Sequence, residues 1–142
     1  NQPAWRQTTF FPFAYTARFG RGKALATRID GPQIHSQRFG NVDTIDAITT
    51  YDAVNQKVAI FLVNRSLTET IETSIFLSGF AVSQIDEQIT MKSTDWLETN
   101  NSSHPNRVAP SNVKSAVFEK SSIEVKISPV SWQVIYVSVK VD

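Results

Sequence analysis

The sequence contains no cysteine among its 142 residues. This absence excludes disulfide bonds and thiolate metal sites, although it fits both a reducing and an oxidising compartment. Equally missing are a Gly-x-Ser-x-Gly elbow, a Walker-type glycine loop and a His-Glu-x-x-His motif. The sequence therefore carries none of these common local signatures of a catalytic site.

An excess of charge of either sign is missing as well, and so are long apolar runs. The 14 basic and 13 acidic residues leave a formal charge of +1, which makes no electrostatic case for nucleic acid or an anionic membrane. No apolar run approaches the roughly 20 residues that span a bilayer, and the first residues lack the order of a signal peptide. We expect neither a nucleic acid nor a membrane as partner.

Groups that could bind a metal or carry out acid-base chemistry are scattered. The two histidines, His35 and His104, lie far apart in the sequence, so we expect no metal site and no cofactor. Asp43 and Asp46 stand close to the start of a strand, where such residues often serve turn geometry. Strand alternation points four glutamates to solvent, namely Glu72, Glu87, Glu119 and Glu124.

Aromatic residues, in contrast, are concentrated near the start of the chain. Residues 5–19 hold six of the fifteen aromatic side chains: Trp5, Phe10, Phe11, Phe13, Tyr15 and Phe19. The segment is expected to be helical, with two apolar rows: Phe10, Phe13, Ala14 and Ala17 on one, and Phe11, Tyr15 and Phe19 on the other. An amphipathic helix needs only one such stripe. The helix is therefore expected either to pack on its own domain alone or to contact a second body as well.

The end of this helix is marked by Arg18 and Arg21 together with Gly20 and Gly22. Cations near the negative end of the helix dipole and a glycine that leaves the helix are typical of a C-terminus. Pro12 either kinks the helix or belongs to its first turn.

After Gly22 the apolar pattern changes to the alternation of β-strands. The expected strands cover residues 45–51, 58–64, 70–77, 81–91, 121–127 and 131–141. The run 58–64 is apolar on both faces, which indicates a central strand. With no second helical pattern, the sequence predicts a mainly β protein, an antiparallel β-sandwich or jelly roll preceded by one helix.

One long irregular segment, residues 93–112, interrupts the strands, and loops of this length are often functional. It contains Trp96, and Trp132 begins the last expected strand; both are candidates for stacking on a sugar ring. A tryptophan is more often a packing residue, and Trp132 alternates with Val134 and Tyr136 as packing residues do. Three Asn-x-Ser triplets, common by chance, begin at Asn64, Asn100 and Asn101.

Four segments in this order, "PAWRQTTFFPFAYTARFGRGKAL", "FLVNRSL", "HPNRVAPSN" and "SPVSWQVIYV", resemble the C-terminal region of family 51 α-L-arabinofuranosidases. The resemblance covers nearly the whole chain. It implies that residues 1–22 are the last helix of a catalytic TIM barrel and that residues 23–142 are the C-terminal jelly-roll sandwich. The six aromatic residues of the first segment would then face the barrel.

The resemblance also places the chemistry elsewhere. Family members hydrolyse terminal α-L-arabinofuranosyl groups with retention, using two glutamates at the ends of barrel strands. No glutamate of this chain matches either position, so we expect no catalytic residue here. The implied partners are the barrel of the same parent protein, arabinose-containing glycans through that parent, and further copies in a homo-oligomer. A bacterial cytoplasm or periplasm is the implied compartment.

Three functions follow as hypotheses. The first is a non-catalytic accessory domain that stabilises the barrel of an α-L-arabinofuranosidase and its assembly. The second is an autonomous carbohydrate-binding module, which requires exposed coplanar aromatic rings. The third is a small hydrolase, which requires a cleft with two carboxyl groups roughly 5 to 10 Å apart.

Overall fold

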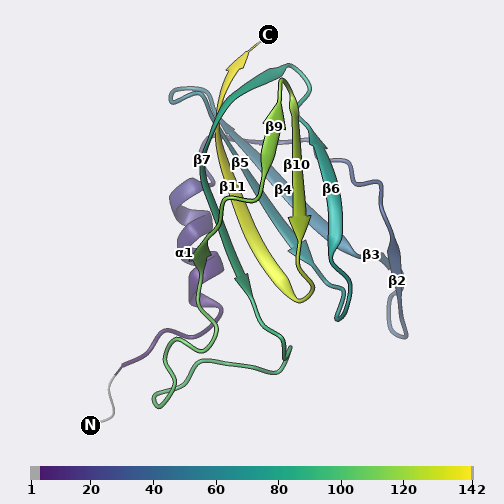
Figure 1. Cartoon of the computed structure of the whole chain (residues 1–142), viewed down its shortest axis with the longest axis vertical. Helices are drawn as coiled ribbons and strands as arrows, with labels where there is room; N and C mark the ends of the chain where they lie inside the picture. The colour runs from purple at the N-terminus through teal and green to yellow at the C-terminus, as the bar shows by residue number, and fades with distance from the viewer. Residues whose placement is uncertain (1–3, 142) are drawn as a thin grey trace.

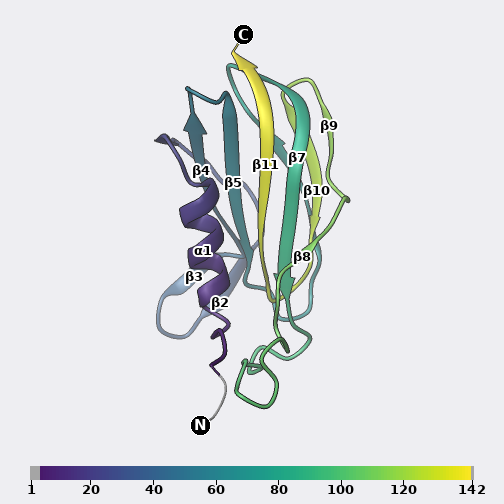
Figure 2. The ribbon, with the colours of Figure 1, turned by 90° about the vertical axis from the view of Figure 1, so that its left-hand side faces the viewer.

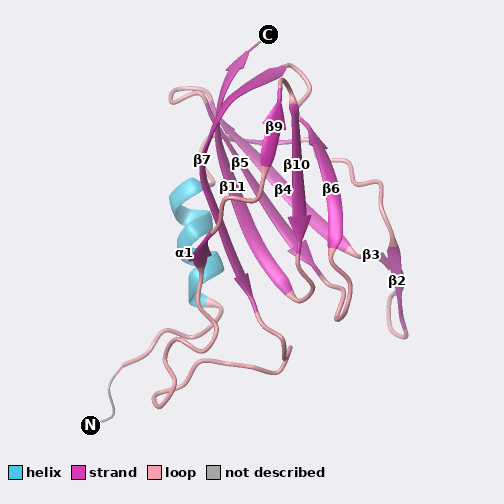
Figure 3. Ribbon diagram, viewed as in Figure 1, coloured by secondary structure: helices cyan, strands magenta, loops and turns pink. Residues whose placement is uncertain are grey.

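The computed structural model describes residues 4–141, which fold into one helix, two packed β-sheets and a separate hairpin (Figures 1 and 3). The elements are α1 (Phe10–Phe19), β1 (Lys23–Leu25), β2 (Gln33–Ser36), β3 (Gly40–Asp43), β4 (Ile45–Asp52), β5 (Lys57–Asn64), β6 (Ile71–Phe76), β7 (Phe80–Lys92), β8 (Ser111–Asn112), β9 (Val117–Glu119), β10 (Ser122–Ile127) and β11 (Ser131–Val141).

The larger sheet has six strands in the order β1-β4-β5-β11-β7-β8, and every pairing is antiparallel. Its centre is β11, which pairs with β5 on one side and β7 on the other. Both faces of β5 are covered: Val58, Ile60 and Leu62 belong to one cluster of buried side chains, and Ala59 and Phe61 to another. The prediction of a central strand at 58–64 is confirmed.

The smaller sheet, in the order β6-β10-β9, packs on the inner face of the larger one (Figures 1 and 2). Ile123, Val125 and Ile127 of β10 point inward, as their alternation predicted, and each is at most 3% exposed. They meet Ile45 and Ile135 of the larger sheet in one hydrophobic core. The predicted antiparallel β-sandwich preceded by one helix is confirmed.

The helix is shorter than the sequence predicted. It begins at Phe10 and not near Trp5, and the residues from Ala4 to Thr9 are irregular. Pro12 is therefore the third helical residue, where its missing N–H interrupts no hydrogen bond because the first four helical N–H groups have no partner within the helix. Of the two alternatives for Pro12, the structure shows the first turn.

Gly22 fixes how the chain passes from the helix into the larger sheet. Its φ of +81° is a left-handed conformation, and a Cβ atom there would lie 2.0 Å from the carbonyl oxygen of Tyr51. Only glycine accommodates both conditions. Lys23 can then pair with Tyr51, so that β1 starts directly after the helix.

The sequence did not predict the hairpin formed by β2 and β3. It projects from the sandwich at the side away from α1 (Figure 1). Side-chain bonds cross it from Gln33 to Asp43 and between His35 and Asn41. Its strands are four residues each and mostly polar, so they lack the alternation from which strands are recognised.

Candidate functional site on the outer face of the large sheet

Helix α1 lies on the outer face of the larger sheet, opposite the smaller sheet (Figure 2). One of its two predicted aromatic rows faces the sheet. The ring centre of Phe19 lies 4.7 Å from that of Tyr136, and the ring centre of Tyr15 lies 6.1 Å from that of Trp132. At the start of the helix, Phe11 packs in a small cluster of its own. This row holds the helix on its own domain.

The other row of α1 is only partly covered in the described part of the chain, where the Phe10 ring packs edge-on against Phe11 and under the Arg6 guanidinium. Phe13 is 80% exposed and Phe10 45% exposed, and Trp5, just before the helix, is 41% exposed. Phe11 and Phe19, in contrast, are 9% and 4% exposed. The six aromatic residues predicted to face a barrel are therefore not equivalent, because the sandwich itself buries Phe11 and Phe19 and partly covers Tyr15.

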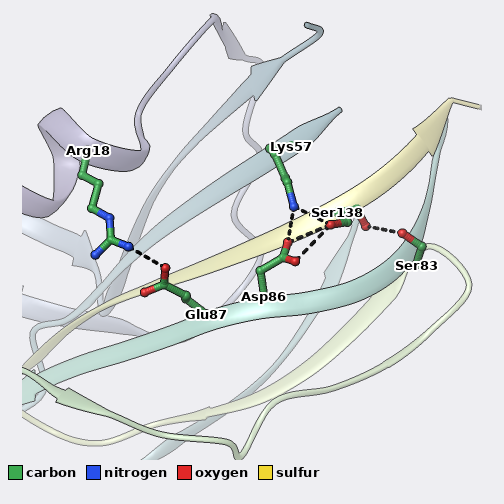
Figure 4. Close-up of polar contacts among 6 residues, drawn as sticks. All are labelled: Arg18, Lys57, Ser83, Asp86, Glu87 and Ser138. Carbon is green, nitrogen blue, oxygen red and sulfur yellow. Dashed lines mark hydrogen bonds and ion pairs between the residues drawn. The ribbon is translucent and has the colours of Figure 1, made fainter. Parts of the chain in front are cut away.

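A polar cluster lies beside the helix, where β7 is irregular (Figure 4). The register of β7 against β11 shifts between Tyr136 and Val137 and again between Ser138 and Val139, which leaves Asp86 and Ser83 as extra residues in β7. Both bond Ser138: its hydroxyl donates to the Asp86 carboxylate at 2.8 Å, and its carbonyl accepts from the Ser83 hydroxyl at 3.1 Å. Lys57 Nζ donates to Asp86 at 2.9 Å and to Ser138 at 2.6 Å.

A second ion pair joins this edge of the sheet to the helix. Arg18 Nη2 lies 2.7 Å from Glu87 Oε1 (Figure 4), and the Arg18 guanidinium also lies over the ring of Phe19.

Burial raises the pKa of the Tyr136 hydroxyl, and the carboxylates of Asp52, Asp86 and Glu87 add to this effect, while Lys57 opposes it. Tyr136 therefore stays neutral at physiological pH and serves as a packing residue.

The long segment 93–112 is held against the start of the chain by one buried asparagine. Asn100 is 6% exposed; its side-chain amide donates to the carbonyl groups of Arg6 and Val108, and its side-chain oxygen accepts from the Val108 N–H at 2.8 Å. The Asn100 N–H donates to the Thr8 hydroxyl. Val108 in turn packs on Phe11, so the loop and the N-terminal segment form one surface.

The two tryptophans proposed for sugar stacking have different surroundings. Trp132 lies partly buried beneath α1, between Tyr15 and Phe61, in the packing role that its alternation indicated. Trp96 is 65% exposed in a turn of the 93–112 segment, next to Leu97, which is also 65% exposed. No aromatic pair in residues 4–141 includes Trp96.

Each of two hollows in the described part of the chain has two acidic residues in its lining. One, of about 790 Å³, lies between β4 and β6 and includes Asp30 and Glu72; the other, of about 820 Å³, lies along β7 and includes Asp86 and Glu87. A hydrogen bond from Lys126 lowers the pKa of Glu72, whereas a general acid needs a raised one. Asp86 and Glu87 are each paired with a cation.

The remaining candidates from the sequence are scattered. Glu119 and Glu124 are exposed, as is His104; His35, also exposed, forms a hydrogen bond with Asn41 within its hairpin. Asp43 accepts a hydrogen bond from Gln33, and Asp46 accepts one from the Ala47 N–H and pairs with Arg65.

Residues 4–141 contain no group of three His, Asp or Glu side chains that could hold a metal ion. Over the same range the structure has no helix long and apolar enough to cross a membrane.

Two buried asparagines join distant segments of the chain by hydrogen bonds, a role that the sequence did not indicate. Asn64 and Asn100 were noted only as starts of Asn-x-Ser triplets, yet both are buried. The side-chain amide of Asn64 donates to the carbonyl groups of Glu69 and Ile127, joining the two sheets. The only sequence signal for such a role is a polar residue at the end of an apolar strand. This signal is present at Asn64 and absent at Asn100.

The sequence of this chain is similar to that of known proteins. The sequence profile of the alpha-L-arabinofuranosidase C-terminal domain matches residues 1–131. An intracellular exo-alpha-(1->5)-L-arabinofuranosidase of Bacillus subtilis is 35% identical over 132 residues, covering 93% of this chain and 26% of that protein. One from Streptomyces lividans, with the same description, is 33% identical over 130 residues, covering 92% of this chain and 20% of that protein.

Solved structures resemble the fold in the same way. A family 51 alpha-L-arabinofuranosidase from Bifidobacterium longum matches 95% of this chain with a TM-score of 0.87 and 31% identity, over 26% of its own chain. A family 51 arabinofuranosidase from Xanthomonas axonopodis pv. citri, at 18% identity and a TM-score of 0.66, shares the fold. The chain spans only 20–26% of the length of these two curated relatives.

Proposed function

This chain belongs to the family of alpha-L-arabinofuranosidase C-terminal domains, and we propose that it stabilises the catalytic barrel of such an enzyme without taking part in catalysis. The parent protein would hydrolyse terminal α-L-arabinofuranosyl groups of arabinose-containing polysaccharides or oligosaccharides with retention. Both catalytic glutamates would lie upstream of this chain. The names of the relatives, exo-arabinofuranosidases, support this activity for the parent.

The exposed row of α1 carries the proposal. An isolated domain gains nothing by placing Phe13 in water, where it is 80% exposed, whereas burying such a side chain in an interface contributes about 1.5–3 kcal/mol. The row comprises Phe10 and Phe13, and Trp5 precedes it. Ile48, which lies beside Phe61 in the sheet, is also 62% exposed and extends the apolar surface.

We place the domain boundary between residues 22 and 23 and assign residues 1–22 to the last helix of the barrel. Under this proposal α1 serves both bodies: Phe11, Tyr15 and Phe19 hold it on the sandwich, and the opposite row packs on the barrel. Phe11 and Phe19 then contribute to the interface indirectly, because they fix the side of the helix that faces outward.

The test is hydrolysis of 4-nitrophenyl α-L-arabinofuranoside by this chain, by the upstream polypeptide, and by their mixture, with complex formation followed by analytical ultracentrifugation. We expect a complex, no turnover by this chain alone, and higher or longer-lived activity in the mixture than in the upstream polypeptide. Turnover by this chain alone would contradict the assignment of its carboxylates to structural roles.

A carbohydrate-binding module is the second candidate, and one observation favours it. The ring of Trp96 is exposed on a surface loop, as a sugar platform would be, although it lacks a coplanar aromatic neighbour. Titration of the chain with α-1,5-linked arabinotriose, followed by tryptophan fluorescence, distinguishes the two. A saturable change that Trp96→Ala removes would favour the module.

We also propose that the parent enzyme is a homo-oligomer. Exposed aromatic residues remain away from α1, among them Phe39 in the β2–β3 hairpin and Phe76 at the end of β6, and they could meet a second copy. Sedimentation of the parent enzyme with and without Phe39→Ser would test this assembly.

A further inference from the structure

The segment 93–112 combines rigid polar bonding with an exposed apolar tip. Ser93, Asp95 and Glu98 organise its first turn: the Ser93 hydroxyl donates to Glu98 at 2.6 Å, and Asp95 accepts from the Leu97 N–H at 2.8 Å. The Glu98 N–H closes the turn on the Asp95 carbonyl. Trp96 and Leu97, each 65% exposed, are therefore held in place on a turn that does not bury them.

Side chains presented in this manner are typical of protein interfaces. A tryptophan that is already ordered loses little conformational entropy on binding, and tryptophan is enriched among the residues that dominate binding energy. A leucine beside it adds apolar area without hydrogen-bonding groups. A sugar platform would instead present a second ring near Trp96, and the aromatic pairs of the described residues do not include Trp96.

The position of the loop identifies the partner. Asn100 bonds the loop to Arg6 and Thr8, which belong to the segment that leads from the upstream body into α1. Trp5 and Phe10, both partly exposed, flank these same residues. Since the match covers only 20–26% of the length of the two relatives, the upstream body is large, and it is joined to the segment to which the loop is bonded.

We infer that the segment 93–112 is a second part of the interface with the upstream catalytic body, that Trp96 and Leu97 are its contact residues, and that Asn100 is the positioning residue that aligns it with α1. This inference rests on the proposed function, because that function supplies the upstream body. It adds a contact some 80 residues away in sequence from the helix, and it assigns a role to the longest loop of the chain.

The absence of cysteine from the 142 residues makes a direct test possible. Leu97→Cys, Phe13→Cys and Val54→Cys each introduce a single thiol into this chain. Val54 is the matched control, because it is 91% exposed in the β4–β5 turn, at the opposite end of the sheet from the segment 93–112. Alkylation of each cysteine by a maleimide is followed by peptide mass spectrometry, in the isolated chain and in the parent enzyme.

We expect Leu97→Cys and Phe13→Cys to react at least roughly tenfold more slowly in the parent than in the isolated chain, because interface burial limits access to transient openings. Val54→Cys should react at the same rate in both. Slow labelling of Phe13→Cys with unchanged labelling of Leu97→Cys would overturn this inference and leave the proposed function standing. Unchanged labelling of both would overturn the proposed function as well.

A sugar at Trp96 is distinguished in the same assay. If α-1,5-linked arabinotriose slows the labelling of Leu97→Cys in the isolated chain, the loop binds a glycan and the inference is wrong. Trp96→Ala supplies an independent readout: it should lower the unfolding temperature of the parent enzyme and leave that of the isolated chain unchanged. If the parent enzyme with Trp96→Ala unfolded at the same temperature as the unsubstituted parent enzyme, Trp96 would not contact the upstream body.

Discussion

The two aromatic rows of α1 have nearly the same chemistry and opposite surroundings. Phe11, Tyr15 and Phe19 meet the outer face of the larger sheet, whereas on the other side of the helix Phe13 is 80% exposed and Phe10 is 45% exposed. A helix that served only the sandwich would need the first row alone. Under the proposed function, this difference makes α1 a joint between the sandwich and the upstream body.

The largest effect should come from breaking the row that faces the sheet. Phe19→Ala removes a ring that is 4% exposed and packs on Tyr136, and it should lower the free energy of unfolding of the isolated chain by about 3–5 kcal/mol. Phe13→Ala, the matched change in the other row, should alter it by less than about 0.5 kcal/mol. Urea denaturation followed by tryptophan fluorescence measures the free energy of unfolding of both variants. If both variants lost the same free energy, the two rows would not differ in how they hold the helix.

The second effect concerns the loop that borders α1. Asn100→Ala leaves the N–H and C=O groups of Val108 and the carbonyl of Arg6 without the partners that they have now, which should cost about 2–3 kcal/mol. Asn106→Ala, at an exposed position of the same loop, is the control and should be neutral. Hydrogen exchange should also rise at the Val108 amide. Normal protection of that amide in Asn100→Ala would show that the loop is held by other contacts.

A smaller effect is expected from the polar cluster beside the helix. Lys57→Met removes the ammonium group that bonds Asp86 and Ser138 and leaves a partly buried carboxylate with the Ser138 hydroxyl as its remaining partner. The expected loss is about 1–2 kcal/mol, reduced by the partial exposure of the pair. The double variant Lys57→Met with Asp86→Asn should recover part of this loss in the same denaturation assay. No recovery would mean that the pair is not coupled.

The smallest effect belongs to Glu72 and Lys126, an exposed pair on the smaller sheet, far from α1. Hydrogen bonding between them lowers the pKa of Glu72 and raises that of Lys126. Any stability from Glu72 is therefore complete above its ordinary pKa of 4.5 and is lost as the pH falls through the lowered value. For Lys126 it is complete below its ordinary pKa of 10.5 and is lost as the pH rises through the raised value.

Because both groups are solvent-exposed, Glu72→Gln should leave the unfolding curve at pH 7 unchanged within error. A pH series of denaturation curves from 3 to 7 checks this expectation. If Glu72→Gln flattened that series, the pair would contribute far more than an exposed ion pair normally does.

Apolar periodicity allowed the sandwich to be predicted from sequence. Strands such as β5 and β10 bury residues in strict alternation or on both faces, and the two rows of α1 were recognised from the 3.6-residue period. The predicted start of the helix was wrong, because Trp5 belongs to the aromatic pattern but lies before the helix begins. The β2–β3 hairpin was missed, since strands of four mostly polar residues show no period.

The candidate site was harder to predict because it depends on contacts between distant segments. The two rows of α1 could be identified, but sequence alone does not say which row a sheet will cover. Asn100 lies 94 residues from Arg6, and a buried asparagine in a polar loop has the composition of any surface turn. The cluster at Ser138 results from the irregular register of β7, which leaves no pattern in the sequence.

The central claim, that the upstream body covers the outer row of α1, is tested most directly by Phe13→Asp. The substitution is made in the isolated chain and in the parent enzyme, and the unfolding temperature of each is compared with that of its unsubstituted form. We predict no change in the isolated chain, where Phe13 is exposed, and a clear decrease in the parent, where a charge would be buried at the interface. An unchanged unfolding temperature in the parent would contradict the claim.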